Sequence, residues 1–246
     1  LTGDTSLECL FILYGATSRN GKGTTMETCL KIMGEKGKTS NPEMLAMKFG
    51  SVSSGGPSEE IARLNGARFV NISEPEKKIT FNSALVKRLT GNDTINARYL
   101  HENSFDFKPE FKIFINTNYL PNVSDMTLFD SGRLKIIPFS RHFSEEEQDK
   151  TLKSFFSREE NLSGIFNWIL RGVVKLRKEG LDMPEAVIEA TGDYRKESDK
   201  IGQFVEAWLD IGRGFEVRTS AVYNVYKNWC VENGYQYNRK ELKQKL

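Results

Sequence analysis

Short apolar runs alternate with amphipathic stretches through the first half of the chain. The apolar residues 10–14 predict a fully buried strand, and the apolar positions 26, 29, 30 and 33 that follow have the spacing of a helix. Further strands are predicted at 69–72, 112–116 and 134–139, with a hairpin over 95–107. Strands interleaved with helices at these lengths indicate an α/β fold with a mostly parallel sheet.

After about residue 144 the apolar period becomes helical throughout. Apolar faces recur at 165–176, at 201–209 and at 222–229. We therefore expect an α/β core over 1–143, a helical extension of that core over 144–198, and a small helical C-terminal unit over 199–246.

Composition and charge narrow the classes of function only a little. The 246 residues carry 35 basic and 33 acidic side chains, a net charge of +2, so any surface for nucleic acid must be local. The apolar run over 9–14 is the longest and is far shorter than the ~20 residues that span a bilayer, so no membrane partner is expected. Three scattered cysteines fit a reducing cytosol, and two histidines leave little material for a zinc site or a Ser-His-Asp triad. The chain begins at Leu1 without a leader, so we expect a piece of a longer polypeptide.

The sharpest chemical signal is GATSRNGKGTT, residues 15–25, which lies between a buried strand and an amphipathic helix. Glycines let successive backbone N–H groups turn toward an anion, and the helix N-terminus adds its dipole. A lysine at this point brings a full charge to the β- and γ-phosphates. We predict an ATP phosphate-binding loop made by Gly15, Asn20, Gly21, Lys22, Gly23, Thr24 and Thr25.

Two features of this loop differ from the usual pattern. One extra residue separates Gly15 from Gly21, and Gly23 stands where a Ser or Thr normally holds Mg²⁺. We expect Thr24 to take that role, directly or through water. Glu74, at the end of the strand FVNISE, is the predicted acid for Mg²⁺ and for the attacking water, although a lone Glu at a strand end is usually only solvated.

Two further residues could act on the γ-phosphate. Asn118 ends another apolar strand, where its amide could orient a water; alone, it would be a turn residue before Leu120-Pro121. Arg133 precedes the strand LKIIPF and is a candidate arginine finger; by default it is an ordinary surface arginine.

The hairpin offers a candidate surface for single-stranded DNA. Arg98, Tyr99 and His101 are predicted around its tip, and Lys87 lies upstream. Cations beside an aromatic ring suit a single strand, because charge follows the phosphates and the ring stacks on bases. An edge hairpin with a charged rim is the equally simple alternative.

Five ordered segments resemble the helicase domain of phage and plasmid primase–helicases, which group with the poxviral primase-helicase in helicase superfamily 3. The segments are RNGKGTT, RLNGARFVNISEPE, KRLTGNDTINARYLHENSFDFKP, FKIFINTNYLPNVSD and SGRLKIIPFSRHF. The resemblance covers roughly residues 1–210. The segment from about Ile201 also resembles a winged-helix unit, of which residues 219–232 would be one helix and which would be truncated after Leu246.

The resemblance implies an AAA+ type core that works as a ring, usually a hexamer, and moves 3′ to 5′ on single-stranded DNA in the cytoplasm of a bacterial host. It implies that Lys22 binds ATP phosphates, Glu74 is the Walker B acid, Asn118 is the sensor, and Arg133 reaches a neighbour's ATP. It also implies that the hairpin in 87–107 contacts DNA and that a primase module lies on the same or a partner chain. Ser73 and Gly132 differ from many relatives, which have an acid and an arginine there.

Two alternatives remain open from the sequence. Gly-Ala at the start of the loop and Gly-Lys-Gly-Thr at its end also resemble nucleoside monophosphate kinases, although the arginines that clamp two nucleotides are not evident. The chain could also be a DNA-loading or assembly module that binds ATP as a switch without unwinding.

Overall fold

A computed structural model describes residues 2–47, 58–73 and 79–245. The chain divides into two compact units, residues 1–191 and 192–246, and each is described by itself.

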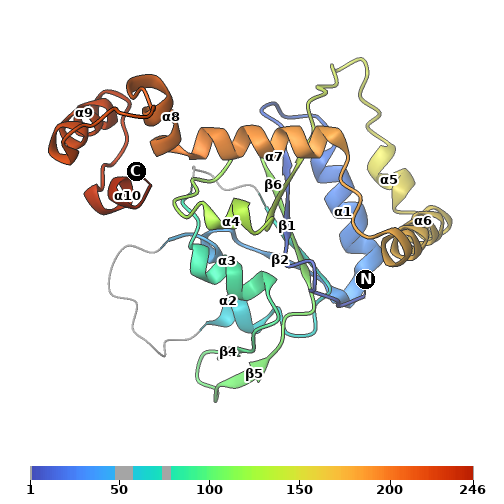
Figure 1. The fold of residues 1–246 in the computed structure, drawn as a ribbon. Coiled ribbons are helices and arrows are strands. Elements are labelled where there is room, and N and C mark those ends of the chain that lie inside the picture. Colours follow the sequence, from blue (N-terminus) through green and yellow to red (C-terminus); the bar gives the residue numbers. More distant parts are fainter. Residues whose placement is uncertain (1, 48–57, 74–78, 246) are drawn as a thin grey trace. The chain divides into compact units, whose positions relative to one another are not determined.

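Unit 1 contains all the strands of the described residues (Figure 1). The strands are β1 (Leu10–Tyr14), β2 (Gly37–Ser40), β3 (Phe69–Ile72), β4 (Ile95–Ala97), β5 (Phe105–Phe107), β6 (Lys112–Thr117) and β7 (Leu134–Pro138). The α-helices are α1 (Lys22–Met33), α2 (Glu59–Ala62), α3 (Ser83–Thr90), α4 (Thr127–Asp130), α5 (Leu152–Phe156), α6 (Glu159–Glu179) and α7 (Glu185–Ser198), the last of which continues into unit 2. Short 3-10 helices are η1 (Gly34–Lys36) and η2 (Pro42–Met44).

The main sheet has the strand order β2-β3-β6-β1-β7, and every neighbouring pair in it is parallel. This confirms the predicted α/β fold with a parallel sheet. The first strand, β1, lies between β6 and β7, so the chain returns to the sheet on both sides of it. In open parallel sheets, ligands bind beyond the carboxyl ends of the strands at such a switch point.

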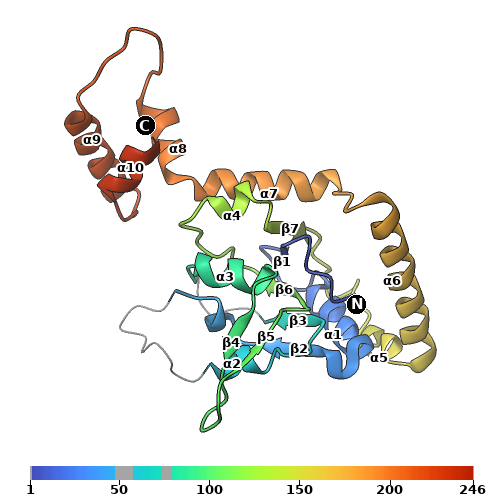
Figure 2. The same cartoon turned by 60° about the horizontal axis from the view of Figure 1, so that its bottom comes forward.

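Both faces of the sheet are covered at its centre, which explains why β1 and β3 read as apolar runs rather than alternating ones. On one face, α1 packs its Met26 against Leu13 and Phe69. The Phe114 ring stacks there on both Phe11 and Phe69. The helices α3 and α4 lie on the opposite side of the sheet from α1, as Figures 1 and 2 show. The strand β1, which leads into the glycine-rich loop, therefore lies in the middle of the core.

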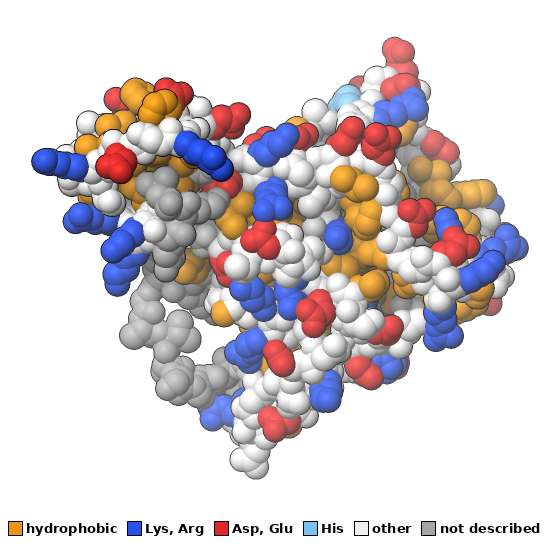
Figure 3. Space-filling model, in the orientation of Figure 1, with side chains coloured by type: hydrophobic (Ala, Val, Ile, Leu, Met, Phe, Trp, Pro, Cys, Tyr) orange, Lys and Arg blue, Asp and Glu red, His pale blue; other side chains and the backbone are white. Residues whose placement is uncertain are grey.

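The helices α5 and α6 lie beside α1. Lys153 of α5 forms an ion pair with Glu27 of α1 at 2.7 Å, and Lys31 of α1 donates to the hydroxyl of Ser157. Part of the apolar surface of these helices stays exposed, and orange side chains are visible over them at the right of Figure 3. The exposed apolar side chains there are Leu152, Phe155, Phe166, Trp168, Leu170 and Val174.

Unit 2 is a helical unit built on the end of α7, α8 (Lys200–Trp208), α9 (Thr219–Glu232) and α10 (Arg239–Lys245). Phe204 and Tyr226 meet edge to face at its centre, with ring centroids 5.1 Å apart. Its buried core consists of Ile201, Phe204, Val222, Tyr226, Trp229, Cys230 and Leu242. The helical period predicted after residue 144 is thus observed as helices α5 to α10. Among the described residues, no helix is both long and apolar enough to cross a bilayer.

Candidate nucleotide-binding site

The glycine-rich loop connects the carboxyl end of β1 to the start of α1, as predicted. Gly21 is the N-cap residue of α1 with φ +89°, a left-handed conformation that favours glycine, and no side chain caps this helix end. The first N–H groups of a helix have no acceptors within the helix, so those of α1 can turn to an anion. A Cβ at Gly21 or Gly23 would meet nothing within 4 Å, so there is open space beside the loop. This geometry fits a bound phosphate group.

The Asn20 side chain braces the loop from inside. Its Nδ2 donates to the carbonyl of Thr17 at 2.7 Å and to that of Phe139 at 3.2 Å, and the residue is 7 % exposed. A Cβ at Gly15 would come within 2.2 Å of this Nδ2. The hydrogen bonds from the Asn20 side chain to backbone carbonyls therefore hold the shape of the phosphate-binding loop. Residue 15 must be glycine because the Asn20 side chain lies so close to it.

The structure brings Lys22 and Asn118 together. The Lys22 ammonium, in a residue only 4 % exposed, donates to the Asn118 Oδ1 at 2.6 Å and to the carbonyls of Gly15 and Thr17 at 3.2 and 3.4 Å. Asn118 follows β6, whose Thr117 pairs with Tyr14 of β1. The oxygens of a bound phosphate would compete for the same Nζ, which is thus placed for the role predicted for it.

A turn at the end of β6 fixes the place of Asn118. The buried Thr117 hydroxyl accepts from the Tyr119 N–H at 2.9 Å and donates to the Tyr119 carbonyl at 2.8 Å. Its own carbonyl accepts from the N–H of Gly15 at 3.3 Å, which joins this turn to the glycine-rich loop. The short local turn therefore holds Asn118 beside Lys22.

The residues predicted to hold Mg²⁺ are only partly described. The half-buried Thr24 lies in the first turn of α1, and the neighbouring Thr25 hydroxyl donates to the Gly21 carbonyl at 3.1 Å. Glu74 lies outside the described residues. In the part of the chain that the structure describes, no three His, Cys, Asp or Glu side chains converge on a metal site. The open space and the Thr24 hydroxyl fit an Mg²⁺ ion that would be coordinated by substrate phosphates and water as well as by protein oxygens, as Mg²⁺ usually is.

Two buried amides beside the loop were missed by sequence reasoning. Asn71 of β3 and Asn116 of β6 lie on the α1 face of the sheet, two residues nearer the loop than Phe69 and Phe114. Neither Oδ1 has a hydrogen-bond partner among the described residues, and both are buried. Buried acceptors in native proteins are nearly always hydrogen-bonded, so these two oxygens are candidate partners for a water or a ligand beside the loop. The available signal was a single polar residue inside each apolar run.

The segment after β7 also contacts the loop and was not predicted as part of the site. The His142 Nδ1 lies 2.8 Å from the Ser18 carbonyl, and the Phe143 N–H donates to the Arg19 carbonyl at 3.0 Å. Arg19 in turn forms an ion pair with Glu145 at 3.1 Å. One side of the loop is therefore closed by residues 139–145.

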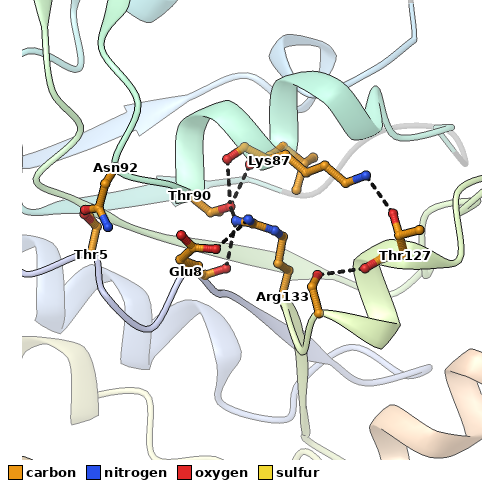
Figure 4. Close-up of polar contacts among 9 residues, drawn as sticks. Thr5, Glu8, Lys87, Thr90, Asn92, Thr127 and Arg133 are labelled. Carbon is orange, nitrogen blue, oxygen red and sulfur yellow. Dashed lines mark hydrogen bonds and ion pairs between the residues drawn. The ribbon is translucent and has the colours of Figure 1, made fainter.

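Arg133 lies at the opposite edge of the sheet from the loop. It precedes β7, whose parallel partner β1 leads into the loop, and four residue steps of strand span about 13 Å. Its guanidinium contacts Glu8 and Thr90 (Figure 4). Arg133 therefore cannot serve the nucleotide of its own subunit, and the predicted role as a finger requires a neighbouring subunit.

The predicted DNA contacts lie in the hairpin and on α3. β4 and β5 form the predicted antiparallel hairpin, and the exposed His101 lies in its connecting turn with φ +62°. The Tyr99 hydroxyl donates to the Ala62 carbonyl at 3.1 Å, and the Arg98 N–H donates to the Ser58 hydroxyl, so the first two residues of this connecting segment are held against α2. Lys87 lies on α3 and forms an ion pair with Asp125 at 2.7 Å. Arg98, Tyr99 and His101 all lie in the segment that connects β4 to β5, where the sequence placed them, and Arg98 and Tyr99 are also fastened to α2.

The Lys87–Asp125 ion pair affects the pKa of Asp125. Partial burial would by itself raise the pKa of Asp125, but hydrogen bonds from Lys87 and Thr127 outweigh it and hold the pKa below its ordinary value. Lys87 also donates to the hydroxyl of Thr127, the first residue of α4, and this contact ties α3 to α4 (Figure 4).

The fold and the loop define a P-loop nucleotide-binding domain. A family model described as poxvirus D5 protein-like matches residues 196–246. "Putative helicase L207/L206" of Acanthamoeba polyphaga mimivirus is 31 % identical over 264 residues, covering 99 % of this chain and 27 % of its own length. "Putative helicase 022R" of Frog virus 3 (isolate Goorha) is 26 % identical over 243 residues, covering 90 % of this chain and 24 % of its own. The chain thus spans about a quarter of the length of these relatives.

The solved C-terminal region of NrS-1 has a similar fold, with a TM-score of 0.54 at 14 % identity over 97 % of this chain and 61 % of that one. The D5-like family model over the C-terminal residues and the viral putative helicases that match nearly the whole chain agree with the family inferred from the five motifs. The relatives are proteins of an amoeba virus and a frog virus, so they do not support the expected phage, plasmid or bacterial-host setting.

Proposed function

We propose that the chain is the motor domain of a helicase that hydrolyses ATP at subunit interfaces to move along single-stranded DNA. The buried Lys22 ammonium, 2.6 Å from the Asn118 amide at the carboxyl ends of β1 and β6, carries this proposal. ATP hydrolysis needs cations around the γ-phosphoryl group and a positioned water more than covalent help from the protein. Lys22 supplies a cation and Asn118 a group that can hold a water.

In this proposal the loop residues 15–25 bind the ATP phosphates, whose charge Mg²⁺ would partly neutralise when bound. Thr24 and Glu74 are the proposed protein ligands of that ion. Arg133 completes the site of an adjacent subunit, because it lies at the opposite edge of its own sheet. A head-to-tail interface of this kind closes into a ring when the rotation between subunits allows it. A hexamer is the assembly that the family resemblance implies.

The hairpin is the proposed DNA contact, with His101 at its exposed turn. Arg98 and Tyr99 belong to the same connecting segment and are held against α2, and Lys87 adds a cation from α3. The relatives are about four times as long as this chain, so a primase module on the same or a partner chain is part of the same proposal.

The test compares wild type with Lys22→Ala, with Lys31→Ala as the matched control. Lys31 is an exposed lysine on the same helix, bonded to Ser157 away from the loop. We expect ATP to give ADP and free phosphate, faster with single-stranded DNA, in wild type and Lys31→Ala and at background level in Lys22→Ala. Equal turnover in all three proteins would refute the proposed site.

Two assays separate the alternative functions. A nucleoside monophosphate kinase would form ADP from ATP and AMP without releasing phosphate. An ATP-switched loading module would bind nucleotide and DNA but would not separate the strands of a 3′-tailed duplex. We expect phosphate release and strand separation.

A further inference from the structure

Arg133 is held by a carboxylate of its own subunit. Its Nη2 lies 2.5 Å from the Glu8 Oε2, and its Nη1 donates to the Glu8 carbonyl at 3.3 Å. The Nη1 also donates to the Thr90 hydroxyl of α3 at 2.9 Å. Figure 4 shows the guanidinium between these two residues. In the absence of a neighbouring subunit, both Nη atoms of Arg133 are therefore hydrogen-bonded to residues of its own subunit.

These contacts enclose the guanidinium. The Arg133 side chain is only 13 % exposed, and its Nε is buried without a hydrogen-bond partner among the described residues. The Glu8 side chain is 42 % exposed, so it is the more accessible member of the pair. A phosphate on a neighbouring subunit could not contact both Nη atoms while Glu8 and Thr90 hold them.

The backbone of Glu8, which pairs with Arg133, has a strained conformation. Its φ is +46°, in the left-handed region that residues other than glycine seldom adopt. The Glu8 N–H donates to the Thr5 carbonyl at 2.9 Å, and the buried Thr5 hydroxyl donates to Asn92 at 2.5 Å. Strained residues persist only where surrounding contacts fix them, and they concentrate at functional sites.

We propose that Glu8 is a latch for Arg133: it holds the arginine at rest, and a neighbouring subunit's nucleotide must take the arginine from Glu8 before hydrolysis. This inference rests on the proposed function, in which Arg133 acts between subunits. A bound triphosphate carries several negative charges, whereas Glu8 carries one. The triphosphate oxygens can therefore displace Glu8 as the partner of the Arg133 guanidinium when the two subunits are aligned. Glu8 acts through Arg133 and is a positioning residue.

The experiment measures ATP turnover per subunit, at saturating ATP, protein and single-stranded DNA, in the full chain with Glu8→Gln. The matched control is Glu110→Gln, because Glu110 also pairs with an arginine, Arg68, at 2.5 Å and is similarly exposed. Partly exposed ion pairs hold their partners weakly, so we expect turnover to rise about two- to five-fold in Glu8→Gln. We expect no rise in Glu110→Gln, and unchanged ATP affinity in both variants.

The unfolding temperature distinguishes the proposed role of Glu8 as a latch from a purely structural role. If Glu8 only fastened residues 2–9 to the core, Glu8→Gln would lower the unfolding temperature and leave turnover unchanged or lower, and that result overturns the latch. Arg133→Ala is measured in parallel. Full turnover in Arg133→Ala would defeat the proposed role of Arg133 itself, whereas background turnover in Arg133→Ala with no rise in Glu8→Gln would defeat the latch alone.

Discussion

The Nζ of Lys22 donates to the Oδ1 of Asn118 at 2.6 Å, although the two residues are 96 positions apart in the chain. One closes the glycine-rich loop after β1, and the other follows β6, the parallel neighbour of β1. The contact therefore joins the cation of the proposed phosphate site to a side chain that can hold the attacking water. Each of the two residues can be changed separately, and the expected effects differ.

We expect Asn118→Ala to lower ATP turnover by about 10²-fold, which is typical for losing one preorganised polar group at a reacting centre. ATP affinity should change only a few-fold, because Lys22 and the loop remain. Steady-state phosphate release and titration with a fluorescent ATP analogue measure the two quantities. If ATP affinity fell while turnover at saturating ATP stayed at the wild-type level, Asn118 would act in binding alone, and this prediction would be contradicted.

Gly15→Ala should destabilise the loop. The new Cβ would lie 2.2 Å from the Asn20 Nδ2 and 2.4 Å from the Phe139 carbonyl oxygen, so one of these groups must move. We expect a loss of about 1–3 kcal/mol in the free energy of unfolding, as for other overpacked sites. Gly23→Ala is the control, because its Cβ would meet nothing within 4 Å. Chemical denaturation of both variants checks this, and equal stability of the two would contradict the role given to Asn20.

Asp125→Asn should have a pH-dependent effect on stability. The depressed pKa of Asp125 means that the folded state favours the carboxylate, so this contribution is present above the ordinary value of 3.8 and is lost as the pH falls through the lowered pKa. Because the Asp125 and Lys87 side chains are 35 % and 38 % exposed, solvent screening limits the contribution to about 0.5–1 kcal/mol at neutral pH. Denaturation from pH 7 to pH 3 should show the two proteins converging in acid. A gap that stays constant over this range would mean that the carboxylate charge contributes nothing.

Tyr99→Phe and His101→Ala should separate structure from DNA binding in the hairpin. Tyr99→Phe removes the hydrogen bond to the Ala62 carbonyl and should cost about 1 kcal/mol of stability while leaving DNA affinity unchanged. His101→Ala changes an exposed residue of the turn and should weaken binding of single-stranded DNA without loss of stability. Fluorescence anisotropy over a salt series is the measurement, with an expected log–log slope of about −0.7 per phosphate contacted in wild type. The opposite pattern in the two variants would reverse these roles.

The hydrophobic pattern of the sequence was enough to predict much of the fold. The runs at 10–14 and 69–72 were predicted with their observed bounds, because strands buried on both faces are apolar throughout. The edge strand β2, with sequence GKTS, was not predicted. It pairs on one side only, with β3, and is mostly half-exposed, so its sequence has no apolar signature.

The site was predictable where it depended on strand ends. Lys22 and Asn118 each follow an apolar strand, and parallel strands bring their carboxyl ends to the same edge. The Glu8–Arg133 pair was not predictable, because it depends on the left-handed backbone at Glu8 and on a contact across 125 positions. The packing of Tyr99 on α2 was missed for the same reason, since it joins residues 37 positions apart.

Mixing two inactive variants tests the central claim most directly. Lys22→Ala keeps Arg133 but loses its own phosphate site, and Arg133→Ala keeps the site but loses the residue offered to a neighbour. If a second subunit completes each site, an equal mixture should recover about one quarter of wild-type turnover, because random assembly pairs an intact Lys22 with an intact Arg133 at that fraction of interfaces. Background turnover at every mixing ratio would contradict the account.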